Sequence, residues 1–531
     1  MDDPQTNPAK ECFDRGVALS NEGKYDEAIG VFSQVLNLQP DYPDAYLHRG
    51  RCYDRKADHD HAIADFTEAI RCAPTQSKPY HFRGVSYAKK KEFDRALADY
   101  NEAVRLDPTD PGVLSNRGST YTATGKPDLA LADFNEALRL DPEFMPAYLN
   151  RGNILLSKGQ DEQGMADFNH VIAKHPDHAQ SYLTRGLALE RRHRFAEAIA
   201  DYNKTLELDP TMDLVFAQRG SARMALQDYT EALADFNEAI KRRPRDAQLF
   251  YHRGVLFSKM SEWPKALQDL SDAVRLDPFH AEAYMTRAMV FCQRNDYPRA
   301  LADLNTRVRL QPPDAAAYFT RGLIRFGRDA YDQAIEDFTT ALRIKPGDLK
   351  SLTNRAMTYR EQKKWELALA DLNEAIRLHP TSGDAHYCRG RVYNDRGAYR
   401  AALADFYKAA ELEPNEQFHH NQLSWVLATC PRDEFRDGAR AIEHGIRACE
   451  LTEWKDGNVM DTLAAAYAEA GQFAKAAELS RKALELAPEA IRDDVASHVK
   501  LFESGKPFRV QPPGASPAPP SGSTRSKRKR H

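Results

Sequence analysis

The 531-residue sequence lacks the features that mark several classes of protein. It has no run of about 18 apolar residues, so we expect no helix that spans a bilayer. The N-terminal stretch MDDPQTNPAK is acidic and has no apolar core, which argues against a secretory signal. The cysteines number only seven, and none has the C-x2-4-C spacing of a zinc or redox pair. These absences favour a cytoplasmic protein with free thiols.

Motifs of catalysis are missing as well. The sequence has no G-x-x-x-x-G-K-[ST] loop, no H-E-x-x-H helix and no G-x-S-x-G turn. The run Asp58-His59-Asp60-His61 combines residue types that bind metals, but we favour its interpretation as a solvated polar turn. We therefore expect a protein that is not an enzyme and has no cofactor, no metal ion and no small-molecule substrate.

Proline, by contrast, recurs with a fixed period. It stands at positions 40, 74, 108, 142, 176, 210, 244, 278, 312, 346, 380 and 414, which are 34 residues apart. A fixed period of this length is typical of repeat architectures, in which each repeat is one supersecondary unit. The sequence therefore predicts a tandem array in place of the three or four globular domains that its length alone suggests.

Each 34-residue repeat has the pattern of a helical hairpin. With the periodic proline at position 32, the first repeat begins at Ala9; position 8 is then glycine or alanine, and position 20 is alanine except at Gly164. Position 24 is always large and apolar, as in Phe32 and Tyr100, so two helices can approach closely around one large side chain. The proline ends the second helix, because it cannot continue the hydrogen-bond ladder.

This pattern resembles the tetratricopeptide repeat (TPR) family, whose 34-residue unit has small residues at positions 8 and 20 and proline at position 32. The end of the chain is similar to that of bacterial multi-repeat TPR proteins with a divergent C-terminal unit. The resemblance implies an all-α fold, a right-handed α-α superhelical solenoid of tandem helical hairpins. It also implies that the first helix of each hairpin lines a concave groove, mainly through positions 2, 5, 6, 9, 12 and 13.

The period also divides the chain. We expect a disordered N-terminus over residues 1–8, twelve regular repeats over 9–416, and two C-terminal repeats over 417–490, the first with an insertion near Pro431. Residues 491–508 form an amphipathic pattern that predicts a capping helix. Residues 509–531 are rich in proline and serine and end in a basic run, so we expect a disordered basic tail.

A periodic charge pair accompanies the hairpins. Position 7 is arginine in all twelve regular repeats, and position 23 is aspartate in eleven of them. In a hairpin that turns near positions 15 and 16, these residues lie opposite each other. Pairing within one repeat, as Arg219 with Asp235 and Arg253 with Asp269, leaves fewer unpaired charges at the array ends than pairing with the preceding repeat. A functional alternative, in which the arginines bind carboxylates in a groove, stays open.

Two sets of residues on the implied groove wall are candidates for binding a partner. Amide side chains can hydrogen-bond an extended peptide through both carbonyl and amide groups, and apolar side chains on an open wall mark partner sites. The amide candidates are Asn116, Asn150, Asn153, Gln218 and Asn354, and the apolar candidates are Tyr251, Met285, Met289, Phe319 and Phe326. Burial of the apolar set against neighbouring repeats is the alternative, and the sequence does not decide between the two.

Charge separates the remaining functional hypotheses. Six of the 74 basic residues and none of the 78 acidic residues lie in 509–531, so the other 508 residues carry a net charge of −10. An acidic solenoid repels phosphate, which confines any nucleic-acid contact to the tail. We therefore expect a protein-protein interaction scaffold that binds a protein or peptide partner in its groove, with no membrane contact. The alternatives are a regulatory subunit of an enzyme complex and nucleic-acid association through the tail.

Overall fold

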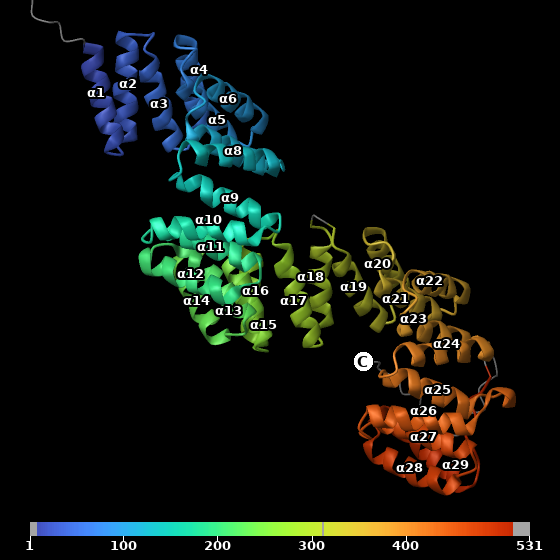
Figure 1. The fold of residues 1–531 in the computed structure, drawn as a ribbon. Coiled ribbons are helices and arrows are strands. Elements are labelled where there is room, and N and C mark those ends of the chain that lie inside the picture. Colours follow the sequence, from blue (N-terminus) through green and yellow to red (C-terminus); the bar gives the residue numbers. More distant parts are fainter. Residues whose placement is uncertain (1–7, 311–312, 513–531) are drawn as a thin grey trace, which may run out of the picture. The chain divides into compact units, whose positions relative to one another are not determined.

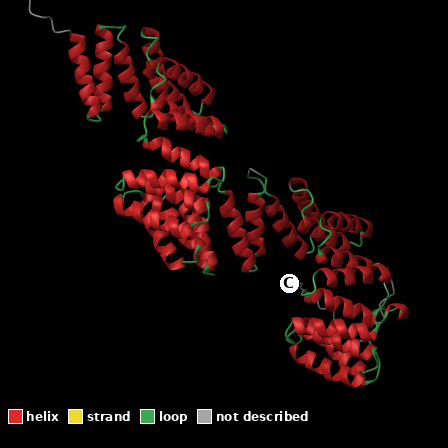
Figure 2. Ribbon diagram, viewed as in Figure 1, coloured by secondary structure: helices red, strands yellow, loops and turns green. Residues whose placement is uncertain are grey.

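The computed structural model describes residues 8–310 and 313–512. Contacts divide the chain into two halves, residues 1–256 and 257–531, and each half is considered by itself. Throughout the described residues the regular structure is helical, and Figure 2 contains no strand. None of the described helices is long and apolar enough to cross a membrane.

The first half consists of paired helices of 13 or 14 residues (Figure 1). Their bounds are α1 Pro8–Asn21, α2 Tyr25–Leu38, α3 Pro43–Arg55, α4 His59–Cys72, α5 Ser77–Lys89, α6 Phe93–Leu106, α7 Pro111–Ala123, α8 Pro127–Leu140, α9 Met145–Ser157, α10 Asp161–Lys174, α11 Ala179–Arg191, α12 Phe195–Leu208, α13 Asp213–Ala225 and α14 Tyr229–Arg242. The next helix, α15 (Ala247–Lys259), contains the boundary between the halves.

The second half repeats the same arrangement. Its helices are α16 Trp263–Leu276, α17 Ala281–Gln293, α18 Tyr297–Arg307, α19 Ala315–Gly327, α20 Tyr331–Ile344, α21 Leu349–Glu361, α22 Trp365–Leu378, α23 Gly383–Asp395, α24 Tyr399–Leu412, α25 Gln417–Thr429, α26 Gly438–Leu451, α27 Gly457–Glu469, α28 Phe473–Leu486 and α29 Arg492–Glu503. Two short 3-10 helices, η1 (Asp433–Phe435) and η2 (Glu489–Ile491), lie in the loops that follow α25 and α28.

Consecutive helices pack as antiparallel hairpins, from α1 with α2 to α13 with α14 in the first half and from α17 with α18 to α27 with α28 in the second. This confirms the predicted fold class, an all-α solenoid of tandem hairpins. The turn of each regular hairpin lies at position 15, where φ is positive in all twelve repeats, as at Ala57 (61°) and Gly125 (72°). A left-handed residue reverses the chain in one step, which lets the second helix return along the first.

The core of each hairpin is one large side chain against one small one. The rings at position 24, such as Phe66 and Phe134, have no more than 1% of their surface exposed. A Cβ added to Gly50 would stand 2.7 Å from the Phe66 ring, so only glycine fits there. In two repeats position 8 is alanine, and there position 24 is the smaller leucine: Ala288 pairs with Leu304 and Ala356 with Leu372, all fully buried. In these two repeats the smaller leucine compensates for the added methyl group, whereas the eighth repeat combines Gly254 with Leu270.

The C-terminal end differs from the regular repeats. The insertion forms the loop with η1 between α25 and α26, and α29 packs against α28 and α27 with Val495 and Phe502 buried. Residues 1–7 and 513–531, most of the two tails that we expected to be disordered, lie outside the described residues. Pro8 begins α1, however, Arg509 pairs with Glu469, and the Val510 N–H bonds the Thr429 carbonyl at the end of α25.

Candidate functional site

The first helices of successive hairpins form one continuous wall in each half. Besides its own partner, the first helix of a hairpin contacts the first helix of the next, as α5 contacts α7 and α21 contacts α23. The second helices reach the next repeat through its first helix, as α4 reaches α5. The first helices of one half, with the side chains they present away from the second helices, are here called the first-helix wall.

The periodic arginines at the edge of this wall are bound within the protein. Arg219 Nη2 donates to Asp235 Oδ1 at 2.6 Å, within the same repeat, and Asp235 is only 3% exposed. The second predicted pair, Arg253 with Asp269, falls across the boundary between the halves and stays a prediction. Arg253 Nη1 does donate to Asn237 Oδ1 at 2.7 Å, and Asp269 is buried. All three nitrogen atoms of the Arg219 guanidinium donate hydrogen bonds within the protein, which favours a structural role.

Every one of these arginines after Arg15, which has no preceding repeat, has a further partner that the sequence analysis missed. Its Nη1 atom donates to position 25 of the preceding repeat: Arg117 to Asn101 at 2.9 Å, and Arg151 to Asn135 at 2.8 Å. Position 25 is asparagine, serine or threonine in the first eleven repeats and Tyr407 in the twelfth, which precedes the first repeat without the arginine. This pairing of positions 7 and 25 could have predicted the contact from the sequence. One arginine side chain thus joins two neighbouring hairpins.

The predicted amide ladder is largely tied to the protein. Asn116 Nδ2 lies 2.8 Å from His81 Nε2, and Asn150 Nδ2 donates to Ser119 Oγ at 3.2 Å, so each links neighbouring first helices. Asn153 and Asn354 each donate to a carbonyl of their own helix, and Gln218 is half-buried. Asn153 also borders a cavity of about 240 Å³ between α9 and α11. In the four asparagines, therefore, the Nδ2 atom already has a contact within the protein.

The predicted apolar set is split. Met289 is 53% exposed and stands open on α17. Phe319 is half-buried against Phe338, with ring centroids 5.8 Å apart, and Phe326 lies beside Tyr331 at 5.9 Å. Met285 packs against the core around Leu304, and Tyr251 is half-buried beside His252. Only Met289 of this set therefore offers a largely open apolar surface.

A larger cavity in the second half was not anticipated. It has a volume of about 800 Å³ and is here called the Arg391 cavity. Its lining comes from α21, α23 and α25, the helix starts and turns beside them, and the C-terminal segment: Arg360, Lys363, Trp365, Arg391, Asn394, Asp395, Arg396, Tyr399, Gln422, Trp425, Val426, Thr429, Cys430, Pro431, Val510 and Gln511. Most of the helical residues occupy first-helix wall positions, among them 9 (Arg391, Trp425) and 12 (Arg360, Asn394).

The cavity has an excess of positive charge. Four basic side chains and one carboxylate, Asp395, line it. Arg360 is 11% exposed and pairs with Asp395 and with Glu361, but its buried Nε has no hydrogen-bond partner. Burial, followed by repulsion from Arg391, lowers the pKa of Arg360 from its ordinary value. The lining thus carries a net positive charge, which favours an anion in the cavity.

The chain's own C-terminal segment borders the same cavity. The Phe508 ring packs on Trp425 and His498, with centroids 5.6 and 4.4 Å away. Arg509 forms an ion pair with Glu469, and the Val510 N–H donates to the Thr429 carbonyl at 3.0 Å. An irregular, non-helical segment is thus held at the end of α25 by an aromatic contact, an ion pair and a backbone hydrogen bond.

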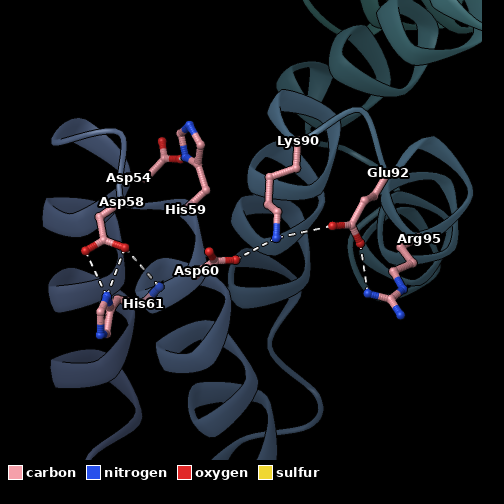
Figure 3. A network of polar contacts seen from close by, with 8 residues as sticks. All are labelled: Asp54, Asp58, His59, Asp60, His61, Lys90, Glu92 and Arg95. Carbon is pink, nitrogen blue, oxygen red and sulfur yellow. Dashed lines mark hydrogen bonds and ion pairs between the residues drawn. The ribbon is translucent and has the colours of Figure 1, made fainter.

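The Asp58–His61 run caps a helix and links two turns, as Figure 3 shows. Asp58 accepts from the backbone N–H of His61 at 3.3 Å, and its carboxylate also contacts the His61 ring at 2.8 Å. His59 lies 3.0 Å from Asp54, and Asp60 accepts from Lys90 at 2.6 Å. Asp58 and His61 contact each other, His59 and Asp60 have other partners, and the four side chains do not converge on one point.

Comparison with known proteins identifies the repeats. Family models described as tetratricopeptide repeat or TPR repeat match residues 13–77, 84–125, 111–144, 179–212, 218–281, 255–312, 290–358 and 356–394. No curated protein sequence matches the chain.

Three solved structures illustrate the similarity of fold. The APC/C hetero-tetramer Cut9-Hcn1 matches with 16% identity and a TM-score of 0.42, over 87% of this chain and 96% of that chain. Yeast Tom70 matches with 17% identity and a TM-score of 0.40, over 81% and 95%. YrrB, described as a TPR protein with an unusual peptide-binding site, matches with 18% identity and a TM-score of 0.28, over 35% and 95%.

Proposed function

Because the chain belongs to the tetratricopeptide repeat family, we propose that it is a non-catalytic scaffold that binds an extended segment of a partner protein. Stacked helical hairpins present long continuous surfaces, which solenoid proteins use for binding. The segment binds on the first-helix wall of the second half, at the Arg391 cavity.

The contact of the C-terminal segment with α25 carries this proposal. Val510 donates a backbone hydrogen bond to the Thr429 carbonyl, beside Arg509 and the packed ring of Phe508. The last carbonyls of a helix have no partner within the helix. At the end of α25 a non-helical segment of the chain supplies the missing hydrogen bond. A partner segment uses the same kinds of contact along the adjoining cavity.

The lining of the cavity specifies the chemistry of the partner. Arg391 has its guanidinium 5.8 Å from the centre of the Tyr387 ring and has no carboxylate partner among the described residues. Lys363 is exposed at the turn that follows α21. With the positive charge of Arg360, these groups favour aspartate or glutamate side chains in the partner, and Trp425 and Tyr399 supply apolar faces.

Selection of peptides by the full-length protein tests the proposal. Random 12-residue peptides are selected on the protein, and the affinities of the enriched sequences are measured by fluorescence anisotropy. We expect enrichment of acidic residues and a loss of about tenfold or more in affinity for Arg391→Gln, since a hydrogen bond to a charged group contributes about 1.5–3 kcal/mol.

Arg377→Gln is the matched control. Arg377 lies on α22, is 66% exposed and pairs only with Glu374 of its own helix. Equal affinities for the Arg391→Gln and Arg377→Gln variants, or enrichment of peptides without acidic residues, would contradict the proposal.

Cytoplasmic localisation remains a prediction from the sequence. A regulatory subunit of an enzyme complex differs from the proposed scaffold only in the identity of the partner. Labelling of proteins near this chain in its native cell, followed by mass spectrometry, identifies that partner.

A further inference from the structure

One junction between repeats brings together three side chains of the types that bind transition metals. Asp384 lies in the first turn of α23, Glu413 follows the end of α24, and His419 lies in the first turn of α25. One ligand atom from each lies within 4.8 Å of the others. This is the one such group that the described residues contain, and it lies apart from the residues that line the Arg391 cavity.

His419 is buried without a hydrogen bond from its ring. Its side chain is 1% exposed, and its Nδ1 atom has no partner. Its Nε2 atom points at the two carboxylates, 3.6 Å from Asp384 Oδ1 and 3.8 Å from Glu413 Oε2. Both separations exceed hydrogen-bond length. An ion held between Nε2 and the two carboxylates is one explanation for these long separations.

The separations suit a cation placed between the three groups. Zinc binds imidazole nitrogen and carboxylate oxygen at about 2.0–2.2 Å in tetrahedral geometry, so its ligand atoms stand roughly 3.4 Å apart. The observed 3.6 and 3.8 Å need a contraction of a few tenths of an ångström. Asp384, whose side chain is 76% exposed, can shorten the first separation, and a small rotation of the Glu413 carboxylate, which is 31% exposed, can shorten the second.

The Glu413 carboxylate is fixed by a second contact. The Gly383 N–H donates to Glu413 Oε1 at 2.8 Å, which leaves Oε2 directed to His419. A Cβ at residue 383 would stand 2.7 Å from the carboxyl carbon of Glu413, so a larger residue would displace the carboxylate. Outer contacts of this kind orient metal ligands in proteins.

The site does not arise from the repeat pattern. Position 3 of a repeat is small in several others, as at Ala45, Ala147 and Ala385, and is histidine only at His419. Among the twelve regular repeats, glycine at position 1 occurs only at Gly383, and glutamate at position 31 only at Glu413, although Gly457 also begins the last repeat. Three departures from the pattern therefore meet at one junction.

We propose that Asp384, Glu413 and His419 bind one divalent transition-metal ion, with zinc as the ion that this ligand set fits best. Two carboxylates balance the charge of the ion, and water completes the tetrahedron. The ion joins α23, the loop after α24, and α25, and so fixes the junction between repeats 12 and 13. This proposal is independent of the proposed peptide binding.

Metal titration of the untagged full-length protein tests it. After dialysis against EDTA, Zn²⁺ binding is measured by calorimetry, and Co²⁺ serves as a probe because its visible absorption reports tetrahedral coordination. We expect one ion per chain. Asp384→Asn and Glu413→Gln should each weaken binding more than about 100-fold, the upper range for the loss of a mere supporting contact.

Two further variants keep the result decisive. His419→Ala introduces the residue that other repeats carry at this position, so it is compatible with folding, and it should abolish the Co²⁺ spectrum. His61→Gln, in the Asp58–His61 turn, should leave binding unchanged. Absence of Zn²⁺ binding by the unaltered chain, or equal binding by all four variants, would overturn the proposal; His419 would then be a partner in an ion pair only.

Discussion

Replacing Arg117 by methionine tests whether the periodic ion pairs hold the hairpins together. Arg117 Nε and Nη2 donate to Asp133 at 2.8 and 2.7 Å, and Nη1 donates to Asn101 of the preceding repeat at 2.9 Å. The side chain of Asp133 is 8% exposed and that of Arg117 is 17% exposed. The substitution therefore leaves a nearly buried carboxylate without either of its donors.

Removal of one member of a buried pair costs about 3–5 kcal/mol. Water can enter the space that Arg117 vacates, so we expect the lower end, about 3 kcal/mol. That corresponds to roughly 150-fold faster amide hydrogen exchange in α7 and α8, since each 1.4 kcal/mol is a factor of ten. Exchange measured by mass spectrometry resolves this change locally, which suits a solenoid whose stability sums over neighbouring repeats.

Two other variants complete the test. The double variant Arg117→Met with Asp133→Leu removes both charges and should recover most of the protection, because an apolar pair replaces a buried ion pair at little cost. Arg139→Met removes an exposed arginine that bonds only Glu136 on its own helix, and should leave exchange unchanged. The reasoning fails if amide exchange in α7 and α8 is as slow in the Arg117→Met variant as in the Arg139→Met variant. It also fails if exchange in the double variant is as fast as in Arg117→Met.

Three further predictions follow from other contacts. Gly50→Ala should destabilise α3 and α4 by about 1–2 kcal/mol, because its Cβ would stand 2.7 Å from the Phe66 ring, and adding Phe66→Leu should reverse this in urea unfolding. Burial lowers the pKa values of His420 and His444, so the unfolded chain binds more protons below about pH 6.5; stability should be full above that pH and fall below it, and His444→Gln should reduce the fall in the urea midpoint. Truncation after Phe508 should raise the affinity of selected peptides about fivefold in anisotropy measurements, since Val510 borders the cavity and its hydrogen bond is lost; an unchanged affinity would contradict a competing role for the segment.

The hairpins were predictable because the residue types at a few positions of each repeat specify them. Proline at position 32 ends each second helix, and small residues at positions 8 and 20 leave room for the ring at position 24. Two exceptions obey the same packing rule, since Ala288 and Ala356 face leucines, whereas Gly254 with Leu270 does not. Periodicity thus encodes contacts that lie within one repeat.

Contacts between repeats were harder to predict. The link from Arg117 to Asn101 could be found only by comparing position 7 of one repeat with position 25 of the preceding repeat. Both positions lose their polar residue at the same junction, where Tyr407 and Leu423 occupy them. The amide of Asn116 was expected to face a partner, but its Nδ2 reaches His81 on the neighbouring helix. Repeat position places a side chain on the wall, whereas its neighbours decide which of its atoms remain available.

The Arg391 cavity could not be predicted from the repeats alone. Its basic side chains stand at positions that are polar in many repeats, and nothing in their spacing marks a cavity. One of its borders comes from Val510, which bonds Thr429 across 81 residues of sequence. A contact between a divergent C-terminal segment and a first helix has no counterpart in the periodic pattern, so the structure was required to find it.

Hydrogen exchange of the full-length protein with and without a selected acidic peptide tests the central claim most directly. If the partner segment binds at the Arg391 cavity, the peptide should slow exchange in α21, α23 and α25, which line the cavity, and leave α22 and α24 unchanged beyond their first turns, where Trp365 and Tyr399 border it. Arg391→Gln should abolish this protection. Protection confined to the first half of the chain, or equal protection of the second helices α22 and α24, would contradict the proposed binding surface.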